Sequence, residues 1–262
     1  MTLLRYTLHD ARRWAAFSGD YNPMHFDNNW VKTHGIKGLS IHGMRALLDV
    51  KCFVSPCVSD SPYLKCTIRL RKPLWHDTTY DMVRDGKKEG SAIVNDISSG
   101  SSCFSCHITP VKNLPFTPDC VSKYELQRDT FASLQKAFIP FQSNIQLWHY
   151  LDAILFRHLI QDRTLLHQEA FATILSSCSN LEELFICYPI LQTHQEIIFD
   201  SHLLSQLSSE SSPELLVIET LPALVIGDLQ LGVIASVTVR THYQNYAISN
   251  TVTLKIGPMS IK

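Results

Sequence analysis

The sequence lacks the features of a membrane-spanning, secreted or strongly charged protein. No apolar run in its 262 residues reaches the roughly 18 residues that a membrane-spanning helix needs. The amino terminus lacks the apolar core of a signal peptide, because charged residues follow Leu3 and Leu4 at once. A formal net charge of −1 gives no bulk attraction for nucleic acid or an anionic membrane. We therefore expect a cytoplasmic protein without nucleic-acid or membrane partners.

The paired cysteine motifs of a structural metal site are also absent. Most of the eight cysteines lie in apolar or strand-like runs, where a reduced thiol behaves as a small hydrophobic group. Cys103 and Cys106 precede His107, but this segment has the pattern of a strand, in which residues three apart face opposite sides. No second pair with zinc spacing follows. We expect no disulfide framework, no metal and no cofactor.

What the chain does contain is enough apolar material for a sizeable core, with 45% apolar and 18% charged residues. Its length suits one large or two ordinary domains. Three prolines near the middle exclude a helix or a central strand there: Pro110, Pro115 and Pro118. We predict two domains, residues 1–112 and 120–262, joined by a linker at 113–119.

The first half predicts short helices, then one buried helix, then strands. A helix over residues 11–18 should be capped by Asp10 and ended by Gly19, and another should run from Pro23 toward Thr33. Residues 43–53 are apolar nearly all round, as in a buried helix. Alternating patterns predict four strands: Leu64–Leu70, Thr78–Arg84, Ser91–Ile97 and Ser101–Val111. The pattern indicates an α+β fold in which an antiparallel sheet wraps one buried helix.

The second half has the same kinds of element in a looser form. Helical spacing runs from Leu147 to Leu159, and residues 165–185 are mostly helical by composition. Stretches rich in Val, Ile and Thr predict three strands: Leu215–Thr220, Leu229–His242 and Tyr246–Ile256. Residues 208–213 should be an exposed loop. We interpret this half as a degenerate copy of the first, with Pro222 to Asp228 corresponding to Pro73 to Asp77.

The most informative segment reads Phe-Ser-Gly-Asp-Tyr-Asn-Pro-Met-His and ends at His25. Gly19 is suited to ending one helix, Asn22 to capping the next, and Pro23 to its first turn. Asp20 and His25 should then project from the two ends of a tight junction, where they can share proton transfer. A bare Asp–His spacing is more often structural, but the surrounding Gly, Asn and Pro favour an acid–base pair.

A second segment, Ile-His-Gly-Met, follows at residues 41–44. In this order the two segments resemble the signature of MaoC-like dehydratases, the R-specific enoyl-thioester hydratases of the hotdog fold. Residues 68–78, with a strand, Pro73 and an Asp-Thr turn, resemble a third segment of that family. The matches span about residues 5 to 111. The resemblance implies a hotdog fold for the first half, and together with the degenerate copy in the second half it leads us to predict a double hotdog.

The resemblance also implies a hydro-lyase of fatty acid or polyketide metabolism. Its substrate would be a 3-hydroxyacyl or enoyl thioester, carried on coenzyme A or on the phosphopantetheine of an acyl carrier protein. Asp20 and His25 would be the acid and base, and the Gly43 N–H would bind the thioester oxygen. We assign Asn22 to holding the turn. His42 either contributes to substrate binding or has a structural role beside the helix start.

Two other functions stay open: a hotdog thioesterase, which would not need this turn, and a non-catalytic acyl-thioester-binding subunit. The second gains support from two departures: Val31 stands where the family usually has a small residue, and Lys51 stands where some members have a hydroxyl. A third departure is His76, which stands where the family has a glycine. The carrier, acyl length and direction are not decided by the sequence. We expect the full chain to be stable as a monomer. A homodimer is compatible with the double-hotdog fold but is not required for its stability.

Asp162 and His167 repeat the spacing of Asp20 and His25, and we place them at the corresponding position of the second half. No Gly, Asn or Pro lies between them to form a turn, and no His-Gly-Met follows. We expect them to be ordinary polar positions on one continuous helix. The second half should then serve as a lid and a pocket wall.

Overall fold

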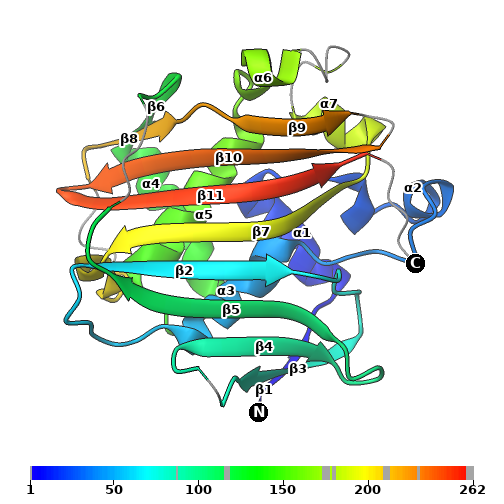
Figure 1. Cartoon of the computed structure of the whole chain (residues 1–262), viewed down its shortest axis with the longest axis horizontal. Coiled ribbons are helices and arrows are strands. Elements are labelled where there is room, and N and C mark those ends of the chain that lie inside the picture. The colour runs from blue at the N-terminus through cyan, green and yellow to red at the C-terminus, as the bar shows by residue number, and fades with distance from the viewer. Residues whose placement is uncertain are drawn as a thin grey trace.

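The computed structural model describes residues 2–86, 88–114, 119–172, 178, 181–208, 213–228 and 231–257. Its described part is built around one antiparallel sheet of eleven strands, with the long helices packed behind one face (Figure 1). Across the sheet the strands are β1 (Thr2–Arg5), β3 (Thr79–Arg84), β4 (Ser91–Asp96), β5 (Ser102–Val111), β2 (Tyr63–Leu70), β7 (Ile190–Asp200), β11 (Tyr246–Ile256), β10 (Gly232–Tyr243), β8 (Leu215–Thr220) and β6 (Ser122–Gln127). The eleventh, β9 (Leu224–Asp228), pairs with β10.

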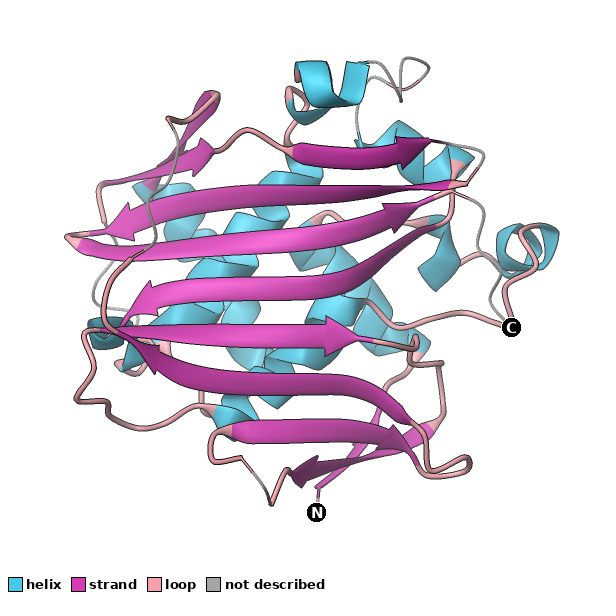
Figure 2. Cartoon of the chain, in the orientation of Figure 1, coloured by secondary structure: helices cyan, strands magenta, loops and turns pink. Residues whose placement is uncertain are grey.

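The helices are gathered on one side of the sheet and around its edges (Figure 2). The α-helices are α1 (Leu8–Ser18), α2 (Asn28–Thr33), α3 (Gly43–Val54), α4 (Arg128–Phe138), α5 (Leu147–Gln161), α6 (Glu169–Ala172) and α7 (Leu181–Cys187). Short 3-10 turns are η1 (Pro23–His25), η2 (Ile139–Phe141), η3 (Leu165–His167) and η4 (Ser201–Leu204). Within the described ranges, no helix is both long and apolar enough to cross a membrane.

The two halves of the sheet have the same strand order counted outward from the centre. The first half gives β2, β5, β4, β3 and β1, and the second gives β7, β11, β10, β8 and β6. They join where β2 pairs with β7, from Tyr63 opposite Asp200 to Arg69 opposite His194. Each half packs one long helix, α3 or α5, against the sheet. The predicted α+β, hotdog-like arrangement is confirmed.

The first half follows its sequence pattern closely. Helix α3 is buried almost all round, with Ala46, Leu47 and Val50 fully buried. The four predicted strands are β2 to β5, with ends within a residue of those expected. Two details are wrong. Helix α1 begins earlier, because Thr7 caps it and Asp10 serves as the third residue of a capping box. The helix expected from Pro23 toward Thr33 is divided into η1 and α2, because Asp27 caps a new helix at Asn28.

In the second half α5, β8, β10 and β11 confirm the pattern, but one correspondence is wrong. Pro222 to Asp228 lies between β8 and β10 and contains strand β9, whereas Pro73 to Asp77 lies between β2 and β3. The segments therefore do not correspond. Strands β1, β6, β7 and β9 were not predicted. Residues 115–118 of the predicted linker and 209–212 of the predicted loop lie outside the described residues.

Candidate functional site

The junction between α1 and η1 places Asp20 and His25 in one buried site. Gly19 ends α1 with a φ of 76°, a left-handed conformation that glycine adopts without a steric cost. The Asn22 side chain then caps η1, accepting a hydrogen bond from the Met24 N–H at 3.1 Å. The Asp20 carboxylate accepts the Asn22 N–H at 3.2 Å. Asn22 therefore caps the turn, as its spacing predicts, and the turn orients Asp20.

Two imidazoles lie together in this site, with the ring centroids of His25 and His42 3.8 Å apart. His25 Nδ1 donates to the Ser40 carbonyl oxygen at 2.8 Å, and His42 Nε2 donates to the Asp20 carbonyl oxygen at 2.9 Å. A carbonyl oxygen only accepts, so each of these nitrogens carries the proton when the ring is neutral. The atoms left to accept a proton are His25 Nε2 and His42 Nδ1. His42 Nδ1 is buried without a partner.

Burial determines the protonation of these groups. It raises the pKa of Asp20, against the opposing effects of His25 and of the Asn22 N–H. It lowers the pKa of both His25 and His42 to about 3. At neutral pH His25 is an unprotonated base, and the Asp20 carboxyl is shifted toward its proton-donating form. General acid–base catalysis requires such a pair, in which one group accepts a proton and the other donates a proton.

The N-terminus of α3 opens into the same site. Gly43 is its first residue, and the preceding His42 provides no side-chain cap. The first N–H groups of a helix have no partner within the helix and form the positive end of its dipole. A Cβ at Gly43 would lie 3.1 Å from both Leu70 Cδ2 and Gln192 Oε1, so a side chain there would require these two side-chain ends to shift by a few tenths of an ångström. Gln192 belongs to β7 and was not predicted.

Asp20, His25 and His42 also have the donor set for a divalent metal ion. One oxygen and two nitrogens of these residues lie within 4.8 Å of one another, and within the described ranges no other such cluster of three occurs. Both imidazoles are oriented by backbone carbonyls, as metal-ligating histidines often are. The expectation of metal-free chemistry therefore stays a prediction that needs a direct test.

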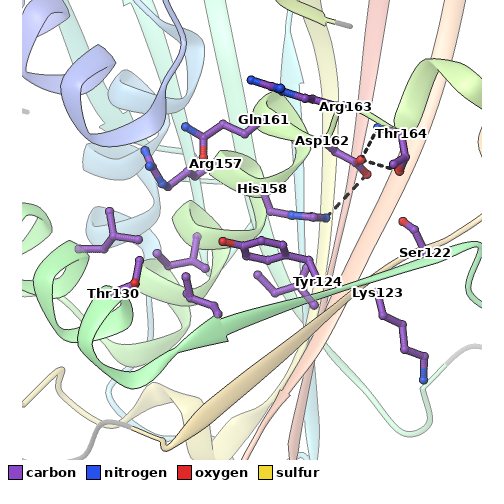
Figure 3. A pocket seen from close by; sticks show the side chains of 14 residues that line it. Ser122, Lys123, Tyr124, Thr130, Arg157, His158, Gln161, Asp162, Arg163 and Thr164 are labelled. Carbon is purple, nitrogen blue, oxygen red and sulfur yellow. Dashed lines mark hydrogen bonds and ion pairs between the residues drawn. The ribbon is translucent and has the colours of Figure 1, made fainter. Parts of the chain in front are cut away.

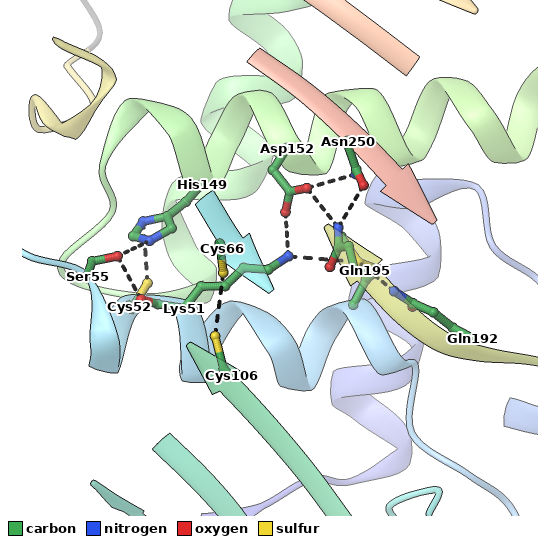
Figure 4. A network of polar contacts seen from close by, with 11 residues as sticks. Lys51, Cys52, Ser55, Cys66, Cys106, His149, Asp152, Gln192, Gln195 and Asn250 are labelled. Atoms are coloured by element: carbon green, nitrogen blue, oxygen red, sulfur yellow. Dashed lines mark hydrogen bonds and ion pairs between the residues drawn. The ribbon is translucent and has the colours of Figure 1, made fainter. Parts of the chain in front are cut away.

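The three departures from the family pattern have structural roles here. Val31 packs with Met24 and Ile36 in a small apolar cluster behind η1. His76 Nε2 donates to the Ser40 carbonyl oxygen at 3.1 Å, the oxygen that also holds His25. Lys51 is fully buried and forms an ion pair of 2.5 Å with Asp152 on α5, so it joins the two central helices (Figure 4).

The prediction for Asp162 and His167 is wrong in two respects. Helix α5 ends at Gln161, and His167 lies in η3, so the pair does not share a helix. Asp162 also follows the second central helix, whereas Asp20 precedes the first. Its carboxylate accepts bonds from Thr164 and faces His158 at 3.8 Å in a pocket of about 400 Å³ (Figure 3).

The buried histidines predict acid sensitivity. The pKa of His25, His42 and His149 falls to about 3 in the folded protein, against about 6.5 when unfolded. The unfolded chain therefore takes up protons first, and stability is lost as pH falls from about 6.5 toward 3. Each histidine contributes about 1.4 kcal/mol per pH unit to the free energy of unfolding in this window.

Urea unfolding between pH 7 and 5 should show this slope, and His42→Gln should reduce it by the share of one histidine. The raised pKa of Asp20 acts in the opposite direction, but it is present in both proteins and cancels in the comparison. Equal slopes for the two proteins would show that folding does not lower the pKa of His42.

Comparison with known proteins gives structural neighbours but no sequence match. No model of a known family matches the chain, and no curated protein matches it. A MaoC-like dehydratase shares 10% identity over 98% of this chain and 96% of its own, with a TM-score of 0.47. A MaoC-like dehydratase from Phytophthora capsici shares 9% over 95% and 93%, with a TM-score of 0.43. An acyl-CoA thioesterase II from Mycobacterium marinum shares 10% over 85% and 93%, with a TM-score of 0.42. These values do not separate dehydratases from thioesterases, so function has to be inferred from the site.

Proposed function

We propose that this chain is a double-hotdog 3-hydroxyacyl-thioester dehydratase that also runs in reverse as an (R)-specific enoyl-thioester hydratase. The observation that carries the proposal is the buried convergence of Asp20 and His25 beside the free N-terminus of α3. The substrate would be carried on coenzyme A or on an acyl carrier protein. The second half acts as the degenerate copy that completes the fold.

Dehydration needs a base for the weakly acidic C2 proton and an acid for the departing hydroxyl. His25 Nε2 takes the C2 proton while its Nδ1–H stays bonded to Ser40, which fixes the ring. The Asp20 carboxyl gives its proton to the C3 oxygen, and that oxygen leaves as water. The electron pair of the C2–H bond forms the C2–C3 double bond. Hydration follows the same path in reverse. In both directions Asp20 and His25 together carry one transferable proton, which is on Asp20 before dehydration and on His25 after it.

The thioester carbonyl must be polarised while the C2 proton leaves, because negative charge moves onto its oxygen. The Gly43 N–H lies at the positive end of α3 and is free to donate to that oxygen. Asn22 keeps the turn in place and does not need to touch the substrate. The His42 ring packs against His25 and donates a hydrogen bond to the Asp20 carbonyl oxygen, so His42 positions both groups.

The direct test is an assay of enoyl thioesters of several chain lengths on both carriers. We expect loss of the enoyl absorbance without release of free thiol, and no change after treatment with a chelator. Release of thiol would identify a thioesterase. Activity that a chelator abolishes and zinc restores would show that Asp20, His25 and His42 bind a metal. The absence of turnover with all substrates would favour a non-catalytic binding subunit.

A further inference from the structure

Two imidazoles share one backbone oxygen beside the acid–base pair. The Ser40 carbonyl oxygen accepts a hydrogen bond from His25 Nδ1 at 2.8 Å and another from His76 Nε2 at 3.1 Å. A carbonyl oxygen has two lone pairs and can accept both bonds. Within the described ranges no backbone N–H donates to this oxygen, so the two imidazoles hold it in place. Ser40 and His25 are buried, which makes the loss of either bond costly.

The backbone of His76 is fixed next to Ser40. Ser40 forms an isolated antiparallel bridge with Trp75, and the His76 N–H donates to the Leu39 oxygen at 3.2 Å. On its other side, the Ser40 N–H donates to the Met24 oxygen in η1 at 3.1 Å. The His76 side chain therefore reaches the Ser40 oxygen from a defined position, close to the turn that holds the base.

The Ser40 side chain offers His25 a competing bond. Its Oγ lies 3.2 Å from His25 Nδ1, the nitrogen that donates to the Ser40 carbonyl oxygen. In this tautomer Nδ1 carries the proton, and Nε2 is free to take the C2 proton of the substrate. In the other tautomer the Ser40 hydroxyl would donate to Nδ1, and Nε2 would carry a proton and could not act as the base. The Ser40 carbonyl selects the active tautomer only while it stays within reach of Nδ1.

We propose that His76 is a positioning residue that keeps His25 in its active tautomer by anchoring the Ser40 carbonyl oxygen. This inference rests on the proposed function and adds to it a residue that does not touch the substrate. Without the His76 N–H, the carbonyl is held by His25 alone and can turn away from it. The Ser40 hydroxyl then donates to Nδ1, and the ring proton moves to Nε2 by exchange with water.

The kinetic test compares His76→Leu, which removes the N–H donor, with His76→Gln, which keeps one on a side chain of similar length. His76→Leu should lower kcat at least about tenfold with little change in KM, because fewer molecules have an unprotonated Nε2 while the substrate contacts remain. His76→Gln should keep most of the activity. Equal losses in both variants would show a packing role and overturn the inference. Normal kcat in both would also overturn it and leave the proposed function intact.

NMR of the imidazole nitrogens measures the tautomer directly and needs no turnover. The His25 proton should be on Nδ1 in the wild type and on Nε2 in most molecules of His76→Leu, with His25→Ala to assign the signals. A proton that stays on Nδ1 in His76→Leu would overturn the inference. A change of tautomer in a protein that turns over no thioester would support the role of His76 and overturn the proposed reaction.

Removal of the competing hydroxyl gives a further check. Ser40→Ala keeps the backbone carbonyl but removes the group that stabilises the inactive tautomer. His76→Leu should therefore lower kcat by less than about threefold when it is added to Ser40→Ala, and the two changes should not be additive. A tenfold loss in both backgrounds would show that His76 does not act through the tautomer of His25, which overturns the inference.

Discussion

Replacing Asp20 by Asn, or His25 by Ala, is expected to lower kcat by at least about a hundredfold, the usual scale for a general acid or base. The carboxamide introduced by Asp20→Asn would keep an oxygen to accept the Asn22 N–H, so the turn should survive while the transferable proton is lost. His25→Ala removes the buried nitrogen that is free to accept the C2 proton. Steady-state kinetics of enoyl hydration measure both effects.

The two groups act on one substrate in one step, so their losses should not add. The double variant is expected to be little slower than the slower single variant. Asp162→Asn and His167→Ala form the matched control, because they repeat the spacing in the second half without a shared turn. They should leave kcat nearly unchanged. Losses of similar size in both halves would show that the second half is catalytic.

At this site, the local backbone structure could be predicted from the sequence. Gly19, Asn22 and Pro23 define the turn locally, since each has a backbone preference that its neighbours do not alter. The structure accordingly places Asp20 and His25 together, as the spacing predicts. Gly43 at the start of a buried helix was likewise readable from apolar periodicity. The proton-transfer roles themselves await the kinetics.

The parts that the sequence did not reveal depend on contacts between distant segments. Strand β7 was missed because Thr193 is an extra residue between the pairs that Gln192 and His194 make with β11, and it breaks the alternation on which strand prediction rests. Its Gln192 was missed with it. Lys51 looked like a departure in the substrate pocket, and its partner Asp152 becomes visible only once α3 and α5 pack together. Asp162 was wrongly matched to Asp20 because the match used only the spacing between the Asp and the His. It did not take into account that Asp162 follows a central helix whereas Asp20 precedes one.

The last prediction concerns the dependence of the first half on the second. Residues 1–112 alone should be insoluble or inactive, although they contain Asp20, His25 and Gly43. Cutting the chain exposes the edge of β2, which pairs with β7 in the full sheet. It also removes Asp152 from the buried Lys51, and an unpaired buried charge costs about 3–5 kcal/mol. That is a large share of the roughly 5–15 kcal/mol that stabilises a typical domain.

Further contacts to the site itself are lost in the fragment. Arg157 on α5 donates to the Phe17 carbonyl oxygen at the end of α1, and Gln192 no longer covers Gly43. Co-expression of residues 1–112 with 119–262 should restore part of the activity, because the interface completes the site and the covalent link only raises the effective concentration. The full chain should be stable as a monomer in sedimentation analysis. A soluble, monomeric 1–112 fragment with full activity would contradict the double-hotdog proposal, since the β2 edge and Lys51 would then need no partner from the second half.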